Sequence, residues 1–240
     1  MGKPTRLFLC RYIIMVTVCC VLWGDKFSDD YVHHLKAGVE RNSTVPYNFV
    51  CYSDRQIEGV KVIPLKQGLD GWWNKLQLFD GRVQGRIVYL DLDTLITNNI
   101  DWLLEYDGGF AGIEDLGAIN SHQQFLKGKL QSAVMSWNSE EMTWVYNEFM
   151  FLRSKATNSF RGDGEYLNMA IGKFNRVLFQ DKYPNQIKSY KYQVYPKNIE
   201  GSSIVCFHGR PSIIQAMSET VNTPMRNYDP QKWISDYWRI

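Results

Sequence analysis

The segment Asp91-Leu92-Asp93 constrains this chain most, because it directly follows the apolar and partly β-branched run Ile87-Val88-Tyr89-Leu90. Such a run is typical of a buried strand. Two carboxylates at the end of a buried strand are costly to bury without a cation. In an extended segment the side chains of residues i and i+2 share a face, so both carboxylates can address one ion. The pattern indicates a site for a hard divalent cation that carries a phosphate.

Apolar runs and helical patterns alternate along the rest of the chain. Helices are expected after the N-cap Ser28, over 72–79, around 100–105, from the N-cap Ser139 onward and over 163–171; strands are expected over 13–22, 49–52, 60–63, 86–90, 110–113, 133–135 and 204–207. This alternation favours an α/β fold with a mainly parallel central sheet flanked by helices. A length of 240 residues suits one domain. We expect that domain over 1–222, with a tail, 223–240, packed on it.

Charge and cysteine content exclude some classes of protein. The formal net charge is +2, which argues against broad electrostatic binding of nucleic acid. There are five cysteines, no CxxC pair and therefore no zinc ribbon. Four of the five lie in apolar runs, which is typical of buried free thiols in a reducing compartment, so we expect a cytoplasmic protein.

The first residues allow two interpretations. The run 7–23 is apolar, but Arg11 interrupts it, and the remaining 12–23 is too short to span a bilayer as a helix. Its β-branched content favours a central strand. A signal peptide is the alternative, although no small-x-small cleavage site is clear. Asn42-Ser43-Thr44 is a glycosylation sequon that has meaning only in a secreted protein.

Other residues could carry chemistry beside the two aspartates. His208 follows a strand and could be a third ligand for Mn²⁺, while Gly209 would let the backbone approach a phosphate and Arg210 could neutralise it. Lys75 precedes the Asp91 strand and could reach a phosphate or a sugar hydroxyl. Each of these residues also has a structural interpretation, such as a surface lysine or a hydrogen-bonded histidine.

Three more candidate residues come later in the chain. Asp163 opens a helix within Gly162-Asp163-Gly164, where it could bind sugar hydroxyls or simply favour the helix N-terminus. Gln131 and Ser132 precede a strand and could line the same cleft.

A phosphatase of the haloacid-dehalogenase type is a rival interpretation of Asp91-Leu92-Asp93, because its nucleophile motif also follows an apolar strand. That motif has Thr or Val where this chain has Leu95, and its strand normally lies near the N-terminus. Ninety residues precede Asp91, so both points weigh against a phosphatase.

The motifs and their order resemble retaining glycosyltransferases of the GT-A fold, specifically family 8, which includes glycogenin and lipopolysaccharide galactosyltransferases. The resemblance covers about 13–211 and rests on these segments: Val21-Leu22-Trp23-Gly24, Trp73-Asn74-Lys75-Leu76, Tyr89-Leu90-Asp91-Leu92-Asp93-Thr94, Gln131-Ser132-Ala133-Val134, Gly162-Asp163-Gly164 and His208-Gly209-Arg210-Pro211.

The resemblance implies a role for each matching residue. Asp91, Asp93 and His208 would hold Mn²⁺ or Mg²⁺, and Asp163, Lys75 and Gln131 would be the catalytic residues. The nucleotide would be bound by Leu22, Trp23, Gly24, Lys75, Asp91, Leu92, Asp93, Gly209 and Arg210. The expected reaction moves a hexose from a UDP-sugar to a glycan, lipid-linked sugar or protein acceptor, with retention of configuration.

The chain also departs from the family pattern. Gly164 replaces a glutamine, Gln131 replaces an asparagine, and the segment after His208 is shortened so that Arg210 must stand in for a lysine. These departures keep open a second hypothesis, a non-catalytic protein that binds sugar nucleotides or glycans. The acceptor pocket is expected in the loops 113–128 and 182–201, and a lipid-linked acceptor would bring the chain to a membrane surface.

Overall fold

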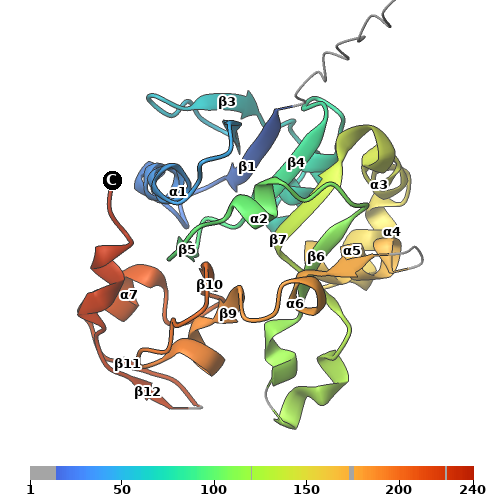
Figure 1. Cartoon of the computed structure of the whole chain (residues 1–240). Helices are drawn as coiled ribbons and strands as arrows, with labels where there is room; N and C mark the ends of the chain where they lie inside the picture. Colours follow the sequence, from blue (N-terminus) through green and yellow to red (C-terminus); the bar gives the residue numbers. More distant parts are fainter. Residues whose placement is uncertain (1–14, 120, 173–175, 225) are drawn as a thin grey trace, which may run out of the picture.

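The structure is a computed structural model that describes residues 15–119, 121–172, 176–224 and 226–240. A seven-stranded sheet in the order β3-β2-β1-β4-β7-β6-β8 lies at its centre (Figure 1). The strands are β1 Val16–Leu22, β2 Tyr47–Ser53, β3 Lys61–Pro64, β4 Arg86–Leu90, β6 Ala111–Glu114, β7 Leu130–Asn138 and β8 Val177–Leu178. Neighbouring strands run parallel except where β7 pairs with β4 and with β6. The predicted α/β fold with a mainly parallel sheet is confirmed.

Strand β1 lies between β2 and β4, and every one of its residues is buried. Its sequence is mostly apolar and rich in β-branched residues, which suits a strand that is covered on both faces. Cys20 pairs with Cys51 of β2, and Thr17 pairs with Ile87 of β4. This pairing brings the ends of β1 and β4, and the loops that follow them, to the same edge of the sheet.

Helices cover both faces of the sheet (Figure 1). On one face, α1 (Asp29–Arg41) buries Val32, Leu35 and Val39, and these residues share a core with β5 (Thr94–Ile96). The other face carries the 3-10 helix η1 (Gly71–Phe79), α3 (Ser139–Phe151) and α5 (Asp163–Ile171), whose buried residues form a second core.

A small sheet brings the last third of the chain to the same edge. In it β10 (Ile204–Cys206) lies between β5 and β9 (Ile187–Ser189). Just past β10, the backbone N–H of Phe207 donates to the carbonyl oxygen of Asp93 at 3.0 Å. The loop after β10 is therefore fixed beside the Asp91–Asp93 segment.

Shorter elements complete the described fold. They are α2 Asp101–Leu104, η2 Leu116–Ile119, η3 Ser121–Leu126, α4 Arg153–Ser159, α6 Phe179–Lys182, the π-helix η4 Tyr190–Val194, α7 Ile213–Ser218, β11 Val221–Asn222, β12 Asn227–Tyr228 and η5 Lys232–Asp236.

The C-terminal residues contact α1. The Arg41 guanidinium donates to the carbonyl oxygens of Tyr237 (2.7 Å) and Arg239 (2.6 Å). The Trp238 ring stacks on His34, with ring centroids 4.7 Å apart. These contacts place the end of the chain on the body of the fold, whereas the division at residue 222 stays a prediction.

Some local predictions needed correction. The N-cap of α3 is Asn138, whose side chain accepts from the Glu140 N–H at 3.4 Å, and not Ser139. Ser28 does occupy the N-cap position of α1, but its hydroxyl donates to Asp30 at 3.2 Å instead of capping the helix. Of the expected strand 13–22, residues 13 and 14 lie outside the described residues, as does the rest of 1–14.

The described cysteines are free and buried, as predicted: Cys19, Cys20, Cys51 and Cys206. Among the described residues, no helix combines the length and the apolar character needed to span a bilayer. In the sequon, Asn42 donates to the Gly38 carbonyl at 2.8 Å, and Thr44 donates to Asp101 at 2.6 Å. The Thr44 side chain thus joins the segment after α1 to α2, whereas the Asn42 side chain bonds back to α1 itself.

Candidate active site

A pocket opens where β1 and β4 end. It is lined by Val21, Trp23, Lys26, Phe27, Trp72, Lys75, Tyr89, Asp91, Leu92 and Asp93. The lining comes from the loop after β1, from η1 and from the segment after β4. In open α/β sheets, ligands bind in the crevice beyond the carboxyl ends of the strands, so this pocket is the first candidate for a functional site.

The Asp91–Asp93 segment is a turn and not the extended stretch expected from sequence. The Asp91 carbonyl oxygen accepts from the Thr94 N–H at 3.1 Å, which closes a turn between β4 and β5. Both carboxylates still line the pocket. Burial, and then the negative charge of Asp91, raise the pKa of Asp93 to about 7. The charge of Asp91 thus disfavours the ionisation of Asp93.

Lys75 links the carboxylates of two distant segments. Its ammonium lies 2.9 Å from Asp91 Oδ1 and 3.2 Å from Asp163 Oδ2, and it donates to Ser132 Oγ at 3.1 Å. Burial lowers the pKa of Lys75, but Asp163 and Asp91 outweigh that effect and leave it raised. Lys75 is therefore a permanently charged group at the pocket wall.

Ser132, and not Gln131, contacts Lys75 and Asp163, and these three residues form a polar cluster. The Ser132 hydroxyl donates to Asp163 Oδ2 at 2.6 Å, while Gln131 lines a neighbouring groove. Asp163 is only 6% exposed and lies behind Lys75, outside the lining of the pocket. The predicted catalytic residues Lys75 and Asp163 thus touch each other, whereas the predicted Gln131 stands apart from them.

His208 lies at the end of β10, one residue beyond the bond between Phe207 and Asp93. Its Nε2 lies 2.8 Å from Ser189 Oγ of β9. Burial, and then the charge of Lys191, lower the pKa of His208 to about 4. The imidazole is therefore neutral at pH 7, which is the form that binds a metal.

The donor set of Asp91, Asp93 and His208 suits Mn²⁺ or Mg²⁺ in kind, since it offers two carboxylates and a neutral imidazole. Burial, and then the charge of Asp91, raise the pKa of Asp93, and the charge of a bound cation would favour the ionised carboxylate. In the described part of the chain, however, no three His, Cys, Asp or Glu side chains are close enough together to hold a metal. The donor types thus suit a cation, but the positions of these side chains do not form a metal site among the described residues, and metal binding stays a proposal.

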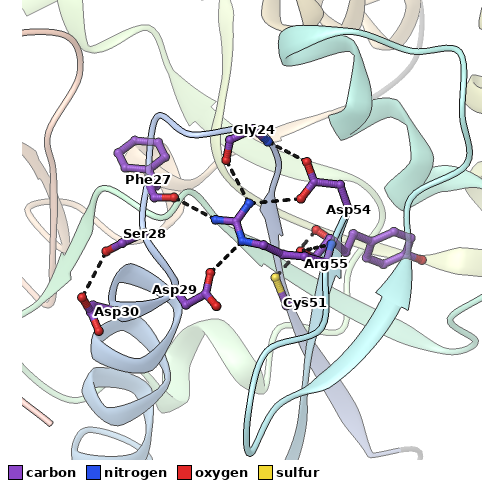
Figure 2. A network of polar contacts seen from close by, with 10 residues as sticks. Gly24, Phe27, Ser28, Asp29, Asp30, Cys51, Asp54 and Arg55 are labelled. Atoms are coloured by element: carbon purple, nitrogen blue, oxygen red, sulfur yellow. Dashed lines mark hydrogen bonds and ion pairs between the residues drawn. The ribbon is translucent and has the colours of Figure 1, made fainter.

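The loop after β1 is fixed by one arginine (Figure 2). The Arg55 guanidinium donates to the carbonyl oxygens of Gly24 (2.9 Å) and Phe27 (3.1 Å) and to the Asp29 carboxylate (2.8 Å). The neighbouring Asp54 accepts from the Gly24 N–H at 2.7 Å. Because Trp23, Lys26 and Phe27 all line the pocket, this network sets the shape of one wall.

The other predicted nucleotide-binding residues are placed as follows. Trp23 and Leu92 line the pocket, and Leu22 is buried in the core. Gly24 and Gly209 adopt positive φ angles of 55° and 76°, which favour glycine. Arg210 is exposed and lies outside the pocket lining.

Sequence reasoning missed several residues of the pocket, among them Lys26, Phe27, Trp72 and Tyr89. The Tyr89 hydroxyl donates to Asp91 Oδ1. Tyr89 had a signal, since it shares a strand face with Asp91 two residues on. Lys26 and Phe27 lie in the loop after the first strand, where the alternation of strands and helices could have pointed to them.

Comparison with known proteins gives similarity of structure only. No family model and no curated protein matches the chain. The glycosyltransferase GlyE of Streptococcus pneumoniae TIGR4 superposes with a TM-score of 0.60 at 12% identity, over 83% of this chain and 56% of that one. Galactosyltransferase LgtC, solved in complex with donor and acceptor sugar analogs, gives 0.56 at 10% identity over 82% and 88%. The chain has a GT-A glycosyltransferase fold.

A third GT-A structure, the bifunctional glycosyltransferase WbbM, superposes with a TM-score of 0.59 at 9% identity, over 83% of this chain and 46% of WbbM. The chain thus spans 56% of the length of GlyE and less than half of WbbM. The predicted resemblance to GT-A glycosyltransferases is confirmed at the level of fold.

Proposed function

We propose that this chain is a metal-dependent glycosyltransferase that moves a hexose from a UDP-sugar to a hydroxyl acceptor with retention of configuration. The observation that carries the proposal is the pocket where Asp91 and Asp93 meet Lys75 and the loop after β1. Carboxylates, a buried ammonium and aromatic side chains at the carboxyl edge of the sheet suit a metal-bound diphosphate with its nucleoside.

The phosphate end of the donor would lie at Asp91 and Asp93. These two carboxylates and His208 would hold Mn²⁺ or Mg²⁺, which when bound offsets the negative charge of the departing diphosphate. Lys26 lines the same pocket, is exposed, and lowers the pKa of Asp93 through its charge. Lys26 is therefore placed to approach a phosphate oxygen.

The sugar would lie beside the cluster of Lys75, Ser132 and Asp163. Lys75 stays protonated and brings positive charge toward the bond that breaks. Asp163 orients Lys75 through the 3.2 Å ion pair and is held by Ser132. A change in the Lys75 position on donor binding would free the Asp163 carboxylate to accept a sugar hydroxyl.

The nucleoside would lie against Trp23 and Phe27, which give an aromatic surface on the loop after β1. The Arg55 network holds that loop before the donor arrives, which lowers the entropy lost on binding. Retention rests on the resemblance to family 8, and a front-face route fits Asp163, whose carboxylate is engaged by Lys75 and Ser132.

The test is UDP release from UDP-hexoses by the purified chain with Mn²⁺. Asp93→Asn keeps the size of the side chain and removes one charge, and we expect it to lower turnover by roughly a hundredfold. Asp181→Asn, at an exposed position of α6, is the matched control and should leave turnover unchanged. Full turnover in Asp93→Asn, or no consumption of any UDP-hexose by the unchanged chain, would contradict the proposal.

A further inference from the structure

A second hollow lies beside the pocket and shares none of its lining residues. It is a groove of about 700 Å³ between the segment around η3 and the start of α5. Its walls include Phe125, Gln131, Phe160 and Gly164. That volume is large enough for several sugar rings and exceeds the volume that a single hexose needs.

The groove is lined by direct chain neighbours of Ser132 and Asp163, which belong to the polar cluster with Lys75. Gln131 directly precedes Ser132, and Gly164 directly follows Asp163. A Cβ at position 164 would lie 3.6 Å from Ser132 Oγ, so the glycine brings the groove wall close to the serine that holds Asp163. A molecule in the groove would therefore end beside the groups that we assign to the donor sugar.

Gln131 supplies an unused hydrogen-bond acceptor in the groove wall. Its Oε1 is buried and has no hydrogen-bond partner among the residues that the structure describes. A buried carbonyl oxygen without a donor is costly. A ligand hydroxyl that donates to Gln131 would remove that cost, which favours a ligand rich in hydroxyl groups.

The opposite part of the groove offers an aromatic surface. Phe125 is 68% exposed, and the Lys129 ammonium lies 5.4 Å from its ring centroid. An exposed aromatic ring beside polar groups suits the apolar face of a sugar ring together with its hydroxyls.

The charges along the groove balance. Asp115, Lys129, Arg161 and Glu165 line it, and Arg161 is paired with Glu165 at 2.7 Å. The Asp115 carboxylate accepts from the Gly117 N–H at 2.8 Å. With two charges of each sign, the groove offers little net attraction to an anionic or a cationic ligand.

We propose that this groove is the acceptor subsite and that it binds an uncharged oligosaccharide, with one ring on Phe125 and a hydroxyl on Gln131. The inference rests on the proposed function, because it needs a donor sugar at the adjacent pocket. The acceptor expected in this groove is a neutral glycan and not a charged saccharide.

Saturation-transfer NMR on the whole chain tests the inference without any donor. The probes are the neutral sugars maltotriose, lactose and chitobiose and the anionic sugar digalacturonate. We expect at least one neutral sugar to bind, and Phe125→Ala to weaken it roughly tenfold. Phe151→Ala is the matched control, because Phe151 is 87% exposed and lines a different hollow.

The outcomes separate the two proposals. Binding of digalacturonate alone, no binding of any neutral sugar, or equal binding by Phe125→Ala would overturn the acceptor subsite. UDP binding in the presence of Mn²⁺, measured by calorimetry on the same samples, should be the same for the unchanged chain and Phe125→Ala. UDP binding without binding of a neutral sugar would overturn only the acceptor subsite. Absence of UDP binding by the wild-type chain would overturn the proposed function.

Discussion

The Lys75 ammonium lies 2.9 Å from Asp91 Oδ1, the same oxygen that accepts the hydrogen bond of the Tyr89 hydroxyl. Asp91 is thus engaged by two donors from the protein, whereas Asp93 has no ion pair or side-chain hydrogen bond among the described residues. A cation at this edge of the sheet would share Asp91 with Lys75. The lysine and the metal would then act on the same carboxylate.

Lys75 is the first residue to change. Lys75→Met keeps the length of the side chain and removes its charge, which leaves Asp91 and Asp163 without their common partner. We expect turnover to fall by about a hundredfold and the free energy of unfolding to fall by about 3–5 kcal/mol, the usual cost of breaking a buried pair. Steady-state kinetics and urea unfolding measure the two effects.

The Lys75→Arg variant tests whether the effects of Lys75→Met come from the lost positive charge. The arginine restores the positive charge, so both turnover and the free energy of unfolding should lie closer to those of the unchanged chain. Unaltered turnover in a folded Lys75→Met variant would show that this ammonium has no part in the reaction.

Arg55 should act on donor binding and not on the chemical step. Arg55→Lys can keep one of the bonds to the Gly24 and Phe27 carbonyls or to Asp29, but not all of them. We expect KM for the UDP-sugar to rise several-fold with kcat nearly unchanged, and Arg55→Ala to raise it further. A fall in kcat at unchanged KM would contradict the role of Arg55 in holding the loop.

Asp101 should make stability depend on pH in the acid range. Burial alone would raise its pKa, but hydrogen bonds from Asn99 and Thr44 lower it to about 2. The folded pKa is below the unfolded value of about 3.9, so the carboxylate stabilises the fold above pH 4. This contribution is lost as the pH falls from about 4 to 2.

Asp101→Asn measures that contribution. The variant should melt at a lower temperature than the unchanged chain at pH 7, and the difference should shrink as the pH approaches 2. A difference in melting temperature that stays constant from pH 7 to pH 2 would show that ionisation of Asp101 contributes nothing.

The fold and part of the site follow from local sequence patterns. The run before Asp91 predicts a buried strand because apolar residues, two of them β-branched, are contiguous there. The start of α5 follows from Gly162 and from the acidic Asp163 in the first turn. The order of the motifs also placed Lys75 and Asp163 in one site, and the structure brings them to 3.2 Å.

Other features depend on contacts between segments far apart in the chain. Arg55 holds Gly24 from the loop after the neighbouring strand β2, and His208 lies against Ser189 of β9. Neither pairing has a periodicity that a sequence shows. The pairing of β6 with β7 has a register shift between Gly112 and Ile113, which no pattern in the sequence marks.

The most direct test of the account is calorimetric titration of the unchanged chain with UDP, in Mn²⁺ and again in EDTA. If Asp91 and Asp93 hold a cation that carries the diphosphate, binding should be at least tenfold tighter in Mn²⁺, and Asp91→Ala should abolish that difference. Equal affinity in Mn²⁺ and EDTA, or no UDP binding in either, would contradict a metal-dependent nucleotide-sugar site.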